Sequence, residues 1–97
     1  MPEINKLADE IVRWRKRKGF KTGWSNMPEK LMLVVTELSE AMEAYRIEDT
    51  ENFAEEAVDA VIRLFDLMRS VNIDIEAKLK RKMAINEKRP FKHGKIC

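Results

Sequence analysis

The chain has 97 residues, 44% hydrophobic and 37% charged, which leaves room for one small domain with a modest core. The formal net charge of +2 hides a segregation, because residues 1–30 carry +4, residues 31–70 carry −7 and residues 71–97 carry +5. No apolar run reaches the ~20 residues that a membrane-spanning helix needs, and residues 1–10 are too polar for a signal peptide. The single cysteine, Cys97, excludes a disulfide scaffold and a CxxC zinc site, so we expect a cytoplasmic protein.

The first half of the chain is expected to form two helices. The first covers residues 2–18, where apolar side chains recur at i, i+3 and i+4, and Gly19 suits its end. Residues 20–27 form a loop that holds Trp24. The second helix covers residues 28–46 and begins at a proline, which is favoured in a first turn.

The second half of the chain continues the same pattern. A polar link over residues 48–50 offers N-caps for a third helix over residues 51–69. Asn72 is expected to cap a fourth helix that fades near Lys88 and is stopped by Pro90. The predicted fold class is therefore all-α, a four-helix bundle with short links. We expect one domain over residues 1–97, made of an N-terminal helix and loop (1–27), core helices (28–89) and a basic tail (90–97).

Four carboxylates occupy unusual positions on the second and third predicted helices. On a helical wheel of ~100° per residue, Glu37 and Glu56 fall inside the apolar arcs, and Glu40 and Asp59 fall at their edges. Helices joined by a short link pack antiparallel, so these four side chains should meet. Four anions in a partly dry cleft need a cation, and carboxylate oxygens suit Mg²⁺ or Mn²⁺. The pattern predicts a metal site; the alternative is two solvated acidic faces, with Asp59 paired to Arg63 at i+4.

The order of these motifs resembles a known family. Glu37-Leu38-Ser39-Glu40 followed by Glu56-Ala57-Val58-Asp59 is similar to the ExxE…ExxD signature of the MazG-like all-α nucleotide pyrophosphatases. Lys82-Met83-Ala84-Ile85-Asn86 followed by Arg89 resembles the family's KMxxN…R ending. The resemblance implies Mg²⁺-dependent hydrolysis of (d)NTPs to a nucleoside monophosphate and pyrophosphate, as in nucleotide-pool housecleaning. It also implies a dimer or a dimer of dimers, with sites near the subunit interfaces.

The resemblance also implies roles for individual residues. The metal ligands, for Mg²⁺ or for Mn²⁺ as a substitute, would be Glu37, Glu40, Glu56 and Asp59. The contacts to phosphates or sugar would come from Lys82, Asn86 and Arg89. Glu40, at the rim of the arc, is our candidate for the base that takes a proton from water. Related sequences often carry an aromatic residue where this chain has Arg63, which could contact phosphate, and Trp24 is the candidate platform for the base.

A basic run over residues 13–18 surrounds Trp14 and supports a second hypothesis. In that hypothesis the protein is a non-enzymatic helical dimer that binds nucleic acid through its basic ends. We favour the simpler interpretation, a solvated helix end whose cations complement the helix dipole. Apolar residues on second faces of the helices indicate at least a dimer. These residues are Val35, Met42, Val58 and Phe65.

Overall fold

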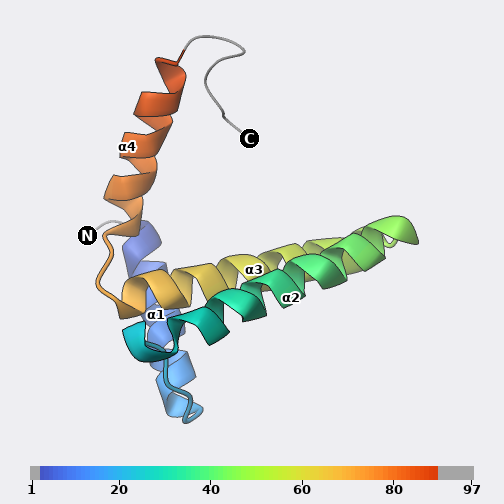
Figure 1. Ribbon diagram of the computed structural model, residues 1–97, viewed down its shortest axis with the longest axis horizontal. Helices are drawn as coiled ribbons and strands as arrows, with labels where there is room; N and C mark the ends of the chain where they lie inside the picture. The colour runs from blue at the N-terminus through green and yellow to red at the C-terminus, as the bar shows by residue number, and fades with distance from the viewer. Residues whose placement is uncertain (1–2, 90–97) are drawn as a thin grey trace.

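The computed structural model describes residues 3–89, which form four α-helices and contain no strand (Figure 1). The elements are α1 (Glu3–Arg17), the short 3₁₀ helix η1 (Trp24–Asn26), α2 (Met27–Arg46), α3 (Thr50–Ser70) and α4 (Ile75–Glu87). The predicted all-α fold class is confirmed. The predicted stop at Pro90 and the predicted basic tail (90–97) lie outside the described residues.

Local signals explain where the helices begin and end. Gly19 follows the end of α1 with φ of +87°, a left-handed conformation that glycine adopts without steric cost. Asp49 caps α3, because its carboxylate accepts a hydrogen bond from a first-turn backbone N–H at 3.0 Å. Asp74 caps α4 in the same way at 3.1 Å. The prediction that Asn72 caps α4 was wrong, since Asn72 lies in the preceding turn with φ of +64°.

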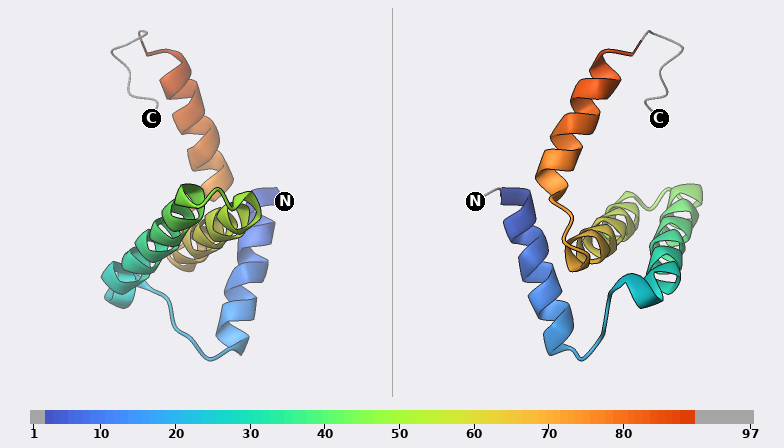
Figure 2. Two further views of the ribbon diagram at one scale, coloured as in Figure 1. Left: turned by 90° about the vertical axis from the view of Figure 1, so that its right-hand side faces the viewer. Right: turned by 60° about the vertical axis from the view of Figure 1, so that its left-hand side comes forward.

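Helices α2 and α3 form an antiparallel hairpin, and α1 crosses α3 near the carboxyl end of α3 (Figures 1 and 2). The core is small and lies where these helices meet. Its buried members are Met27, Val34, Ala60 and Leu67, with Leu64, Met68 and Val71 packed against them. This packing holds the first half of α2 against the second half of α3.

Polar side chains fix α1 against α3 and against the start of α4. The side chain of Asn5 is buried; its Oδ1 accepts from Ile75 N at 2.9 Å and its Nδ2 donates to Asp74 at 2.8 Å. Arg69 Nε donates to Asp9 Oδ1 at 2.6 Å. These bonds tie the first turn of α4 to α1, and they set the direction in which α4 leaves the body of the protein.

α4 projects away from the hairpin (Figures 1 and 2). It contacts α1 and α3 near its first turn and makes no contact with α2. A single chain therefore forms a three-helix body with a projecting helix, rather than the expected four-helix bundle. None of the helices over residues 3–89 is both long enough and apolar enough to cross a membrane.

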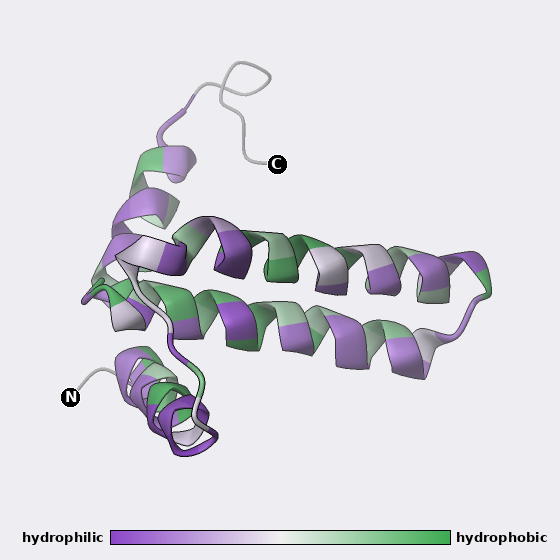
Figure 3. Cartoon of the chain, turned by 60° about the horizontal axis from the view of Figure 1, so that its bottom comes forward, coloured by the Kyte–Doolittle hydropathy of each residue, from purple (hydrophilic) through white to green (hydrophobic). Residues whose placement is uncertain are grey.

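Large apolar side chains remain exposed along the outer face of α2. They recur at intervals of three and four residues, so they share one face of the helix. The row consists of Leu31, Val35, Leu38, Met42 and Tyr45. Figure 3 shows hydrophobic segments along the whole length of α2 and α3. We call this row the α2 apolar face; it includes two of the residues that predicted an oligomer.

Candidate metal centre

Three of the four predicted carboxylates come together in the middle of the hairpin. Glu37 on α2 faces Glu56 and Asp59 on α3, and one carboxylate oxygen of each lies within 4.8 Å of the others. Glu56 and Asp59 share a face of α3 because they are three residues apart. Glu37 is only 9% exposed, and the other two are partly buried. We call these three residues the carboxylate cluster.

Glu40 lies on α2 beside the cluster, at its solvent-exposed edge. Glu40 is close enough to raise the pKa values of both Glu37 and Glu56. It is not among the three groups whose oxygens lie within 4.8 Å of one another. Glu40 is therefore a neighbour of the cluster and not one of its three members.

The crowding of acids raises the pKa values of two of them. The pKa of Glu56 rises to about 7, chiefly because of its hydrogen bond to Glu40, and further because of desolvation and the charges of its acidic neighbours. Burial raises the pKa of Glu37, and Glu40 and Asp59 add to the effect while Arg63 opposes it. One oxygen of Glu56, Oε2, is fully buried and makes no hydrogen bond. An all-oxygen donor set with an orphaned buried oxygen is suited to a hard divalent cation.

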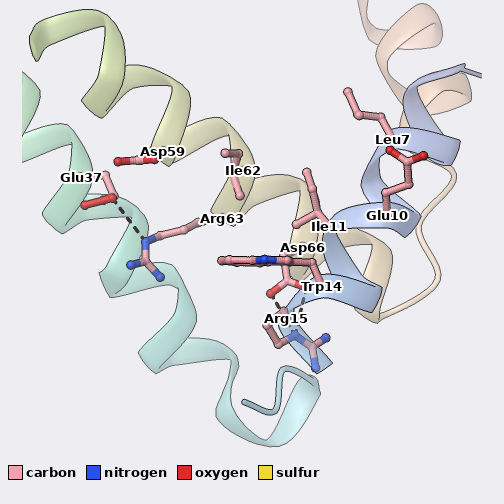
Figure 4. Close-up of a pocket in the computed structure, with 10 residues that line it drawn as sticks. All are labelled: Leu7, Glu10, Ile11, Trp14, Arg15, Glu37, Asp59, Ile62, Arg63 and Asp66. Atoms are coloured by element: carbon pink, nitrogen blue, oxygen red, sulfur yellow. Dashed lines mark hydrogen bonds and ion pairs between the residues drawn. The ribbon is translucent and has the colours of Figure 1, made fainter. Parts of the chain in front are cut away.

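Arg63 forms an ion pair with a member of the cluster. Its Nε lies 3.6 Å from Glu37 Oε2, and its side chain is 42% exposed. The alternative in which Arg63 pairs with Asp59 at i+4 is wrong, because the ion pair joins α3 to α2 instead. Figure 4 shows the guanidinium directed at Glu37, with Asp59 on the far side of that carboxylate.

A cavity of about 490 Å³ opens beside the cluster, between α1, α2 and α3. One end is charged and carries Glu37, Asp59 and Arg63 (Figure 4). The rest of the lining combines the apolar side chains of Leu7, Ile11, Trp14 and Ile62 with the charged side chains of Glu10, Arg15 and Asp66. Its volume falls in the range of small-molecule sites, which is about 300–1,000 Å³. Trp14, in the basic run of α1, lines this cavity and is half exposed.

Of the predicted substrate contacts, only Arg63 lies beside the cluster within one chain. Lys82, Asn86 and Arg89 belong to α4 and the turn after it, which project from the body (Figure 1). Asn86 Oδ1 is buried and makes no hydrogen bond. Trp24 lies in η1, is 79% exposed and does not line the cavity. The helix faces alone could not predict this arrangement, because it depends on the path of α4.

Sequence reasoning missed Arg15, which it assigned to a solvated basic helix end. Arg15 is buried, and its Nε donates to Asp66 Oδ1 at 3.2 Å. Its other nitrogens donate to Phe20 O at 3.0 Å and to Ser70 Oγ at 2.7 Å, and Thr22 Oγ1 donates to Asp66 at 3.0 Å. The sequence held one signal for its burial. Arg15 lies four residues after Ile11, so both share the apolar face of the first helix. Arg15 and Asp66 also line the cavity.

No family model matches the chain, and no curated protein or solved structure shows significant similarity to it.

Proposed function

We propose that this protein is a Mg²⁺-dependent nucleoside triphosphate pyrophosphohydrolase. The observation that carries the proposal is the carboxylate cluster. There, two helices bring one carboxylate oxygen from each of three acids within 4.8 Å of one another. The adjoining cavity supports it, because its lining offers both charged groups for phosphates and apolar side chains, Trp14 among them, for a base. The choice of triphosphates over other anions rests on the motif resemblance in the sequence.

The residues of the cluster fit the ion that the proposal needs. Glu37, Glu56 and Asp59 would hold Mg²⁺, or Mn²⁺ in its place, through carboxylate oxygens. When bound, the ion would neutralise phosphate charge and lower the pKa of a water molecule that it binds. Glu40, at the exposed edge of the cluster, is placed to accept the proton of the attacking water. Arg63, at the charged end of the cavity, is placed to meet a phosphate.

We further propose that the active protein is a homo-oligomer, a dimer or tetramer, assembled through the α2 apolar face. Burying a row of half-exposed aliphatic and aromatic side chains stabilises association. In such an assembly α4 of one copy reaches the site of another, and Lys82, Asn86 and Arg89 contact substrate there. Trp24, exposed in η1, is then the candidate base contact from the same region of the assembly.

The test of activity is incubation with a panel of (d)NTPs and Mg²⁺, with products separated by ion-exchange chromatography. We expect a nucleoside monophosphate and pyrophosphate; orthophosphate with a diphosphate, or no turnover, would refute the proposal. Replacing a residue that only hydrogen-bonds a metal ligand typically lowers activity by about 10- to 100-fold. Glu37→Gln removes a proposed ligand itself, so it should lower kcat by more than that. Glu43→Gln is the matched control, because Glu43 lies on the same helix, is exposed and pairs with Arg46.

Mixing of subunits tests the assembly. Glu56→Gln and Lys82→Ala proteins, each inactive alone, should regain activity when they are mixed, because some sites then combine an intact cluster with an intact α4. Absence of any recovery, with subunit exchange shown by a tagged copy, would refute completion of the site by a second chain.

A further inference from the structure

Arg63 places a positive charge where the cluster is most buried. Its Nε lies 3.6 Å from Glu37 Oε2, and Glu37 is the most buried of the clustered acids. Both oxygens of a carboxylate share one charge, so a carboxylate that is paired with a guanidinium is a weaker ligand for a cation. Arg63 thus acts on the one cluster member that α2 contributes.

We infer that Arg63 is the internal counter-cation of the cluster, and that a divalent ion gains Glu37 as a ligand only by displacing the Arg63 guanidinium. The inference rests on the proposed metal centre and adds a residue that sets its affinity. The Arg63 guanidinium can leave Glu37 at low cost, because its side chain is 42% exposed and lines the cavity. There it can be solvated or can bind an anion. A buried guanidinium such as that of Arg15 could not exchange partners at comparable cost.

Through Arg63, binding of the metal ion would be coupled to binding of an anion in the cavity. In the absence of an ion, Arg63 offsets part of the repulsion among the acids and stabilises the contact between α2 and α3. Once the ion holds Glu37, the released guanidinium lies at the charged end of the cavity. Metal loading would therefore be weaker than the acids alone allow.

The experiment is a titration of the 97-residue chain with Mn²⁺ alone, at one fixed pH and ionic strength. The electron paramagnetic resonance signal of the free ion reports how much Mn²⁺ stays unbound. Arg63→Gln should bind Mn²⁺ about three- to tenfold more tightly than the native protein, a gain between those of an exposed and a buried ion pair. A merely structural role for Arg63 would lower the affinity instead. Arg46→Gln is the control, because it removes the same charge from an exposed pair on α2 and should change the Kd by less than about twofold.

A second background separates release of Glu37 from a general charge effect. In Glu37→Gln protein, Arg63→Gln should give no further tightening, because no carboxylate remains to be released. An equal gain in both backgrounds would overturn the inference, as would unchanged or weaker binding in Arg63→Gln protein whose helicity is native. If Mn²⁺ does not saturate any variant, the metal centre and the inference fail together; if it binds all variants equally, the inference alone fails.

Discussion

Replacing Arg15 with methionine should destabilise the protein by about 3–5 kcal/mol, because it leaves the Asp66 carboxylate buried without its cation. The two side chains are 10% and 13% exposed, and Arg15 Nε lies 3.2 Å from Asp66 Oδ1. Methionine keeps the apolar stem, so the loss reflects the charge and its hydrogen bonds rather than a cavity. The hydrogen bonds to Phe20 O and Ser70 Oγ are lost as well.

This loss is large for a domain whose total stability is about 5–15 kcal/mol. At about 4–8 °C per kcal/mol for a domain of this size, the Tm should fall by at least about 12 °C. The assay is urea and thermal unfolding followed by circular dichroism, at one protein concentration because association would add to the apparent stability.

Two comparisons make the Arg15 prediction specific. Arg46→Met removes an exposed pair, whose side chains are 64% and 67% exposed, and should cost about 0–1 kcal/mol. The double variant Arg15→Met with Asp66→Leu should be more stable than Arg15→Met alone, because no uncompensated charge remains. A loss below about 1 kcal/mol for Arg15→Met, equal to that of the control, would refute the reasoning.

Three further outcomes are expected. The pKa of Glu56 is raised from 4.5 to about 7. Between these pH values the folded protein binds more protons than the unfolded chain. The free energy of unfolding of the metal-free protein should therefore fall as the pH rises through this window. Glu56→Gln should flatten this slope in urea unfolding measured across the window; an unchanged slope would contradict the assignment. Leu38→Lys should reduce the assembled mass measured by light scattering, whereas Ser39→Lys, exposed and adjacent on α2, should not; equal masses would exclude the α2 apolar face as the interface. Asn5→Ala should cost about 1–3 kcal/mol by leaving backbone N–H groups at the start of α4 unpaired, seen as faster hydrogen exchange there than in α2.

The sequence predicted the helices well because helical periodicity and capping are local. Gly19 and Asp49 mark their boundaries as expected, whereas Asn72 does not, because Asp74 is better placed to accept from the first turn. The pattern of apolar residues also placed Glu37 and Glu56 on inward faces, since the wheel position of a residue follows from its number alone. The convergence of the cluster therefore required only that α2 and α3 pack antiparallel.

The tertiary structure alone decided which charges pair and where α4 goes. Arg63 pairs across the hairpin with Glu37 rather than along its own helix, and Arg15 turns inward to Asp66, because each choice depends on which faces of different helices meet. The direction of α4 depends on a single turn and on the side chain of Asn5, over 60 residues away in sequence. By itself, the amino-acid sequence determined that this is an all-helical chain with acids inside its central hairpin. Long-range packing decided how those acids are neutralised and that α4, which carries Lys82 and Asn86, stands away from them within one chain.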